Sequence, residues 1–226
     1  AGDSNRIVRN MRRVAAFLGL DNDNLHIDIL YGTVKVSYSD ESHSFSRFAH
    51  SDKNTINMKV LADVSQLSWK AIREDESIKS FERKLDDPTL VKPDYPAWMV
   101  ILGAAMGSGG FSVLFGGDWP SFIPAAISGF VGFSVRYFLL SNRFNFYMVT
   151  ALTAFLATLT AWLMFLILPE GFTQCPYHSF LCCALFLVPG VALINFLDDM
   201  LDNYLLVGLA RLGNAALQIA SMTFGI

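Results

Sequence analysis

The chain has 226 residues, of which 53% are hydrophobic and 16% are charged, a formal net charge of −3 and a mean hydropathy of +0.39. This composition is too apolar for an ordinary soluble domain, and the balanced charge offers no basic field for nucleic acid. Of the 17 Lys and Arg residues, only Arg136, Arg143 and Arg211 lie beyond residue 96. We therefore expect a polar cytoplasmic domain over residues 1–96 and a transmembrane domain over residues 97–226. Because the first residue is Ala1, we also expect the natural chain to begin further upstream.

Helical spacing of apolar residues opens the polar domain. Ile7, Met11, Val14 and Leu18 recur on one face of residues 1–20, and Gly19 is expected to end this helix. Arginines occupy the remaining surface of the helix, as is typical of a helix that faces solvent or a membrane.

Period-two alternation follows in the segments LHIDILYG, TVKVSYSD and HSFSRFAH, which predict a small antiparallel meander. Helical spacing returns over residues 57–73 and 77–85. The polar domain is therefore predicted to be α+β. It contains no nucleophile elbow, phosphate loop or Gly-rich fingerprint, so no catalytic residue, metal or cofactor is expected.

Five long apolar runs follow, and each reaches the ~20 residues that cross a bilayer. They cover residues 97–117, 119–140, 144–169, 179–197 and 204–226. We therefore predict an α-helical membrane protein with five transmembrane helices and a small N-terminal α+β cytoplasmic domain. Arg136 and Arg143 flank the loop between the second and third runs, which places that loop and the N-terminal domain in the cytoplasm by the positive-inside rule.

Small residues recur on the first two of these helices, at Gly103, Gly107, Gly129 and Gly132. Small residues let helices approach closely, either inside one chain or between subunits. Both uses remain open from the sequence.

The most unusual stretch is LVPGVALINFLDDMLDNYLLVGLAR, between Leu187 and Arg211. Pro189 and Gly190 interrupt an apolar run, so the helix is expected to bend or unwind there. Broken helices of this kind expose backbone groups to the substrate in many secondary transporters.

Polar and charged residues follow that break. Asn195, Asp199 and Asp202 are spaced by four and three, and so share one helical face. Arg211 could bind a substrate carboxylate through its planar fork, or pair with an aspartate when no substrate is present. The alternative is a static kink with solvated aspartates and a structural Arg–Asp pair.

At these residues the chain resembles the threonine/serine exporter family. PGVALINFLDDM, followed after DNYLLV by GLAR, is similar to the family's signature, and LGL, INMKV, YPAW, GGDW and NFY extend the resemblance over nearly the whole chain. It is most similar to the split branch of the family, whose members export succinate together with a separate small membrane subunit. The resemblance implies a second membrane subunit, a hetero-oligomer and a location in the bacterial cytoplasmic membrane.

The resemblance also implies functional positions, which match the family residue by residue at Pro189, Gly190, Asn195, Asp199, Gly208 and Arg211. A Gly-Asp pair of many single-chain members is replaced by Asn203-Tyr204, which favours the dicarboxylate branch.

The sequence thus predicts export of a small carboxylate, either a succinate-like dicarboxylate or threonine/serine. Pro189, Gly190, Asn195 and Arg211 are expected to bind substrate, and Asp199 and Asp202 to couple or gate transport. Two alternatives remain. One is a membrane scaffold or sensor without transport activity. The other is an intramembrane prenyl-transfer enzyme that would hold magnesium and a diphosphate with the DDMLD cluster.

Overall fold

The computed structural model describes residues 2–42, 44–51, 57–74, 77–92, 95–169 and 171–226. The chain divides into two compact units, Ala1–Lys92 with Val191–Gly213, and Pro93–Gly190 with Asn214–Ile226. The first unit therefore combines the polar N-terminal part with residues that the sequence assigns to the fourth and fifth spans. The limits of the membrane domain itself stay a prediction.

Helix α1 (Ser4–Phe17) opens the first unit, with Asp3 as its N-cap residue. The Asp3 carboxylate accepts the N–H of Arg6 at 3.1 Å, which satisfies one of the free donors at a helix start. The helix ends as predicted at Gly19, whose φ of 76° suits a glycine. The N–H of Leu20 donates back to the carbonyl of Ala15 at 2.9 Å, which closes a Schellman motif.

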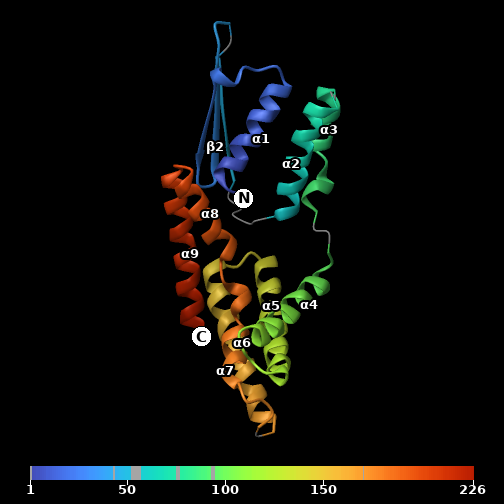
Figure 1. Cartoon of the computed structure of the whole chain (residues 1–226), viewed down its shortest axis with the longest axis vertical. Coiled ribbons are helices and arrows are strands. Elements are labelled where there is room, and N and C mark those ends of the chain that lie inside the picture. The colour runs from blue at the N-terminus through green and yellow to red at the C-terminus, as the bar shows by residue number, and fades with distance from the viewer. Residues whose placement is uncertain (1, 43, 52–56, 75–76, 93–94, 170) are drawn as a thin grey trace. The chain divides into compact units, whose positions relative to one another are not determined.

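The predicted meander is confirmed. A short 3₁₀ turn, η1 (Asn22–Asn24), leads into β1 (Leu25–Leu30), β2 (Thr33–Ser39) and β3 (Ser44–His50), which pair antiparallel in the order β1-β2-β3. Leu25 lies opposite Tyr38, and both pack with Ala15 of α1 in a small buried cluster. Figure 1 shows α1 beside this sheet.

Helices α2 (Met58–Arg73) and α3 (Ile78–Leu85) and the 3₁₀ turn η2 (Pro88–Val91) complete the polar part of the first unit. Helix α2 packs against α1. The ring of Phe81 on α3 lies 5.5 Å from that of Phe17, and the guanidinium of Arg13 lies 4.0 Å from the centre of the Trp69 ring. The predicted α+β character of the N-terminal part is therefore observed.

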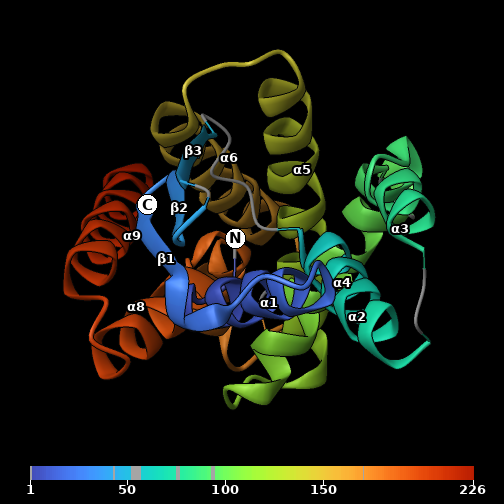
Figure 2. The ribbon, with the colours of Figure 1, turned by 90° about the horizontal axis from the view of Figure 1, so that it is seen from above.

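The second unit begins with α4 (Ala97–Leu114), η3 (Trp119–Ser121), α5 (Phe122–Ser141) and α6 (Phe146–Ile167). Helix α5 packs against both α4 and α6, and Figure 2 shows α5 and α6 side by side. Gly129 lies against Ser108, and Gly132 lies against Ala157, so a Cβ at either position would collide with its neighbour. These two glycines therefore serve packing inside the chain.

The loop before η3 is held by Asp118. Its carboxylate accepts the N–H groups of Ser121 at 3.1 Å and Gln174 at 2.8 Å, and it also accepts the Thr173 hydroxyl. The bond from Thr173, followed by the backbone bonds, keeps the pKa of Asp118 below its ordinary value, because hydrogen bonds favour the charged form. One carboxylate thus joins two loops of the second unit.

The remaining elements are α7 (Pro176–Cys182), η4 (Leu185–Leu187), α8 (Gly190–Leu201) and α9 (Leu205–Gly225). The helical path is interrupted between Cys182 and Gly190, which confirms the predicted break at Pro189. The side-chain amide of Gln218 on α9 donates to the carbonyl of Leu187 at 2.7 Å. A carbonyl at the break is thereby satisfied by a side chain rather than left open.

In the described part of the chain, four helices are long and apolar enough to cross a membrane, namely Ala97–Leu114, Trp119–Ser141, Phe146–Ile167 and Leu205–Gly225. The bent pair Pro176–Leu187 and Gly190–Leu201 adds a fifth if it forms one span. The chain is therefore mostly helical with four or five candidate spans and a small sheet near its N-terminus.

Candidate functional site

The predicted face holds two buried residues of α8 and one exposed residue just beyond the end of that helix. Asn195 and Asp199 are 9% and 0% exposed, whereas Asp202, three residues further on, is exposed. Asp198 is also exposed, since it points away from this face. Of the three aspartates, only Asp199 is therefore enclosed by protein.

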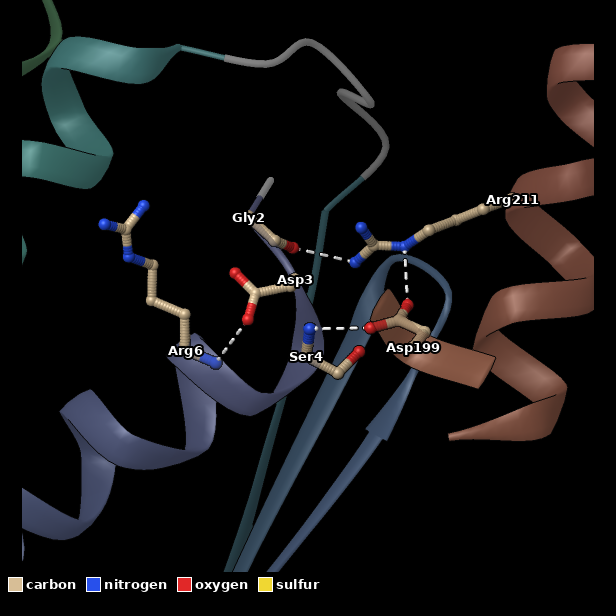
Figure 3. A network of polar contacts seen from close by, with 6 residues as sticks. All are labelled: Gly2, Asp3, Ser4, Arg6, Asp199 and Arg211. Atoms are coloured by element: carbon tan, nitrogen blue, oxygen red, sulfur yellow. Dashed lines mark hydrogen bonds and ion pairs between the residues drawn. The ribbon is translucent and has the colours of Figure 1, made fainter. Parts of the chain in front are cut away.

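Asp199 forms an ion pair with Arg211 of α9, with 3.0 Å between Oδ2 and Nε. Arg211 is itself only 8% exposed, and its Nη2 donates to the carbonyl of Gly2 at 2.8 Å. The other carboxylate oxygen, Oδ1, accepts the backbone N–H of Ser4 at 2.8 Å. Figure 3 shows these contacts, in which the start of α1 meets α8 and α9. Of the two arrangements open to Arg211, the structure has the pair with an aspartate.

The start of α1 favours a negative charge at this place. The first N–H groups of a helix have no partner inside the helix, and the helix dipole makes this end positive. The Ser4 N–H is one of these donors. The Asp199 carboxylate therefore accepts a hydrogen bond from a helix N-terminus and forms an ion pair with a guanidinium. Isolated charges are expensive to bury, and this pairing is what makes a fully buried carboxylate tolerable.

The pair is not saturated with hydrogen bonds. Oδ2 of Asp199 and Oγ of Ser4 are buried, and neither has a hydrogen-bond partner within the described residues. The contact from Arg211 to Oδ2 is therefore an ion pair without good hydrogen-bond geometry. A second contact between α1 and this segment lies at the surface, where the Asn5 amide donates to Asp202 at 2.8 Å.

The turn between α8 and α9 sets the distance between Asp199 and Arg211. Asn203 has a φ of 65°, and the N–H of Tyr204 donates to the carbonyl of Asp199 at 2.8 Å, which forms a Schellman motif. Asparagine is the usual substitute for glycine at this position. Gly208 then lies against Met200 and the carbonyl of Phe196, where a Cβ would be in tight contact with both, so glycine lets the two helices approach closely.

A cavity of about 390 Å³ adjoins the pair within the first unit. One wall is the β1–β2 turn and the end of β3, including Val34 and Ala49, and Ile7 of α1 also contributes. The helix wall contains Asn195 and Arg211. The lining is mostly apolar, with Arg211 as its charged residue among the side chains described.

The structure therefore brings some of the predicted residues together and leaves others apart. Asn195 and Arg211 line the cavity, and Asp199 binds Arg211. Pro189 and Gly190 form the break but do not line the cavity, and Asp202 is at the surface. Sequence reasoning missed Gly2 and Ser4, which contact the pair through backbone atoms and so leave no signal in residue type.

The DDMLD cluster does not assemble as a metal site. No group of three or more His, Cys, Asp or Glu that could hold a metal occurs within the described residues. Asp199 faces Ser4 and Arg211, whereas Asp198 is exposed on another side of the helix. This arrangement gives no support to the prenyl-transfer alternative.

Comparisons with known proteins agree with the membrane character of the chain. A protein of Klebsiella aerogenes described as "Probable succinate transporter subunit YjjP" is 29% identical over 172 residues, which are 76% of this chain and 65% of that protein. A "Probable threonine/serine exporter" of Mycobacterium tuberculosis is 28% identical over 168 residues, which are 74% of this chain and 31% of that protein. The matched part thus spans less than two thirds of either relative. No solved structure matches the chain.

The family comparison covers almost every residue. The profile described as "Putative threonine/serine exporter" matches residues 2–226. This family consists of transporters or exporters, in agreement with the several apolar helices of the chain. The chain therefore belongs to the threonine/serine exporter family.

Proposed function

We propose that the chain is one membrane subunit of a two-component secondary exporter of small carboxylates. The substrate is a succinate-like dicarboxylate, or threonine or serine. In this proposal the N-terminal part is cytoplasmic, the protein lies in a bacterial cytoplasmic membrane, and the bent pair of helices is the fourth of five spans. The chain itself has no catalytic role.

The observation that carries the proposal is the buried Asp199–Arg211 pair. Ionisable residues in apolar helices are rare, and they mark substrate or ion pathways. A substrate carboxylate offers the same ligand to Arg211 as Asp199 does, and a guanidinium binds a carboxylate well because its planar fork matches the two oxygens.

Asp199 then supplies the coupling. When Arg211 turns to a substrate, Asp199 keeps the Ser4 N–H but loses its countercharge. A buried carboxylate without a countercharge is costly, so the exchange favours uptake of a proton or movement of the helices. Either response links substrate binding to a change at α8. The hydrogen bond from the Asn5 amide to Asp202 supports a part for Asp202 in that change.

The partner subunit is supported by the comparisons. The Klebsiella aerogenes relative is described as a transporter subunit, which supports an assembly of more than one polypeptide. Arg136 and Arg143 near the α5–α6 loop support the cytoplasmic placement of that loop.

The test is efflux of succinate and of threonine from cells that express the chain with and without its partner subunit. Efflux of one substrate only when both proteins are present would support the proposal and identify the cargo. Lack of efflux of either substrate, with both proteins in the membrane, would overturn it and favour a scaffold or sensor. Asp199→Asn and Arg211→Gln, inserted at normal levels, should each abolish efflux.

A further inference from the structure

We infer that the 390 Å³ cavity of the first unit is where the exporter recognises its carboxylate, with the N-terminal sheet as one wall of the binding site. This inference rests on the proposed function. It assigns the polar N-terminal part a role in substrate selection, and it moves recognition away from the helix break.

The lining of the cavity has the character of a small-molecule site. Such sites are mostly apolar with a few convergent polar groups, and their volumes begin at ~300 Å³. Here the apolar part comes from Ile7, Val34 and Ala49 on one side and from Ala192 and Val207 on the other. At about 390 Å³ the cavity suits a small metabolite with a short carbon chain.

The polar part of the lining is placed for a carboxylate. Asn195 and Arg211 come from neighbouring helices and line the same cavity, so an amide and a guanidinium border one space. Behind them, the Gly2 carbonyl accepts from Nη2 of Arg211, and the Asp199 carboxylate pairs with its Nε. In the proposed exchange, a substrate carboxylate in the cavity replaces Asp199 as the partner of the guanidinium.

The helix break does not offer these features. The carbonyl of Leu187 is bonded to Gln218, and Pro189 is buried. Pro189 and Gly190 are outside the lining of the cavity. The Leu187 carbonyl at the break is therefore already occupied, whereas the cavity combines open volume with a cation.

The experiment replaces one small residue on each wall of the cavity with a large one and leaves Arg211 unchanged. Ala49→Trp on β3 and Ala192→Phe on α8 occupy the cavity, and each has a neighbour outside it as a matched control, namely Phe48→Trp and Val191→Phe. Succinate binding to the purified protein is measured by calorimetry, and the KM and kcat of efflux are measured in proteoliposomes with the partner subunit. Both cavity variants should bind succinate at least about tenfold more weakly and raise KM. The large side chain and the substrate would occupy the same space, and that overpacking costs more than the 1.4 kcal/mol of a tenfold change. The controls should match wild type.

A second variant separates recognition from misfolding. Val207→Ala enlarges the cavity, so efflux of the longer dicarboxylate adipate should rise relative to succinate, a change in selectivity that loss of folded protein cannot produce. If the wild-type protein exports succinate and Ala49→Trp and Ala192→Phe both keep its KM, the cavity assignment is overturned and the exporter function stands. Lack of efflux from wild type would instead remove the proposed function on which the inference rests.

Discussion

The backbone N–H of Ser4 donates to Oδ1 of Asp199 at 2.8 Å, across a sequence separation of 195 residues. This single bond joins the first turn of α1 to α8, and both partners are fully buried. The polar N-terminal part and the part of the family motif from Val191 onward are thus components of one compact unit.

The contribution of that bond can be measured with proline, because proline is tolerated at the first helical position and has no N–H to donate. Ser4→Pro should lower the free energy of unfolding by ~1–3 kcal/mol, since it leaves a buried carboxylate oxygen without its donor. Ser4→Ala keeps the N–H and removes a hydroxyl that has no partner among the described residues, so its stability should equal or exceed that of wild type. Thermal unfolding of the detergent-solubilised protein distinguishes the two. Equal stability of both variants would contradict the importance of this bond.

A double-mutant cycle tests the role of the Asp199–Arg211 pair. Asp199→Asn or Arg211→Gln alone should destabilise the protein by ~3–5 kcal/mol, because each leaves one buried charge unpaired. The double variant should lose less than the sum of the two, because no charge remains. Efflux by the double variant then tests whether the pair acts in transport. If Arg211 contacts substrate, the stable double variant stays inactive, whereas recovered efflux would show that the pair is only structural.

Gln218 should be important for the helix break. Gln218→Leu keeps the volume of the side chain but removes the donor to the Leu187 carbonyl, and should destabilise the protein by ~1–3 kcal/mol. Ser221→Ala, one turn away on α9, removes a hydroxyl that donates to the carbonyl of Leu217 in its own helix, and should be close to neutral. Unfolding in denaturant compares them. A Gln218→Leu variant as stable as the Ser221→Ala control would mean that the carbonyl finds another donor.

The stability that Asp118 gives to its loop should depend on pH. Its pKa is lowered in the folded protein, so the stability that its charge provides is present above the ordinary value of 3.8 and is lost as the pH falls through the folded value. Asp118→Asn should therefore reduce the melting temperature at neutral pH and approach wild type in strong acid. Thr173→Val, which removes the largest contribution to the shift, should reproduce part of this effect. A constant difference between wild type and Asp118→Asn at every pH would contradict it.

Several elements could be predicted from the chain because their causes are local. Alternation of apolar residues from Leu25 determines the meander, and helical spacing with Gly19 determines where α1 ends. Pro189 lacks an N–H and interrupts the helix wherever the chain is placed. Charge segregation likewise marked the apolar C-terminal part, which contains the four or five candidate spans.

The site depended on tertiary structure. The residue types of Asn195, Asp199 and Arg211 announce a polar face and a possible pair, and the structure contains that pair. No local pattern indicates that Asp199 meets the backbone of Ser4, or that Val34 and Ala49 of the sheet face Arg211 across a cavity. Backbone donors carry no residue identity, and contacts between segments nearly 200 positions apart depend on how the whole first unit packs. The sequence by itself therefore determined the elements and the chemistry available, and tertiary packing decided which groups meet.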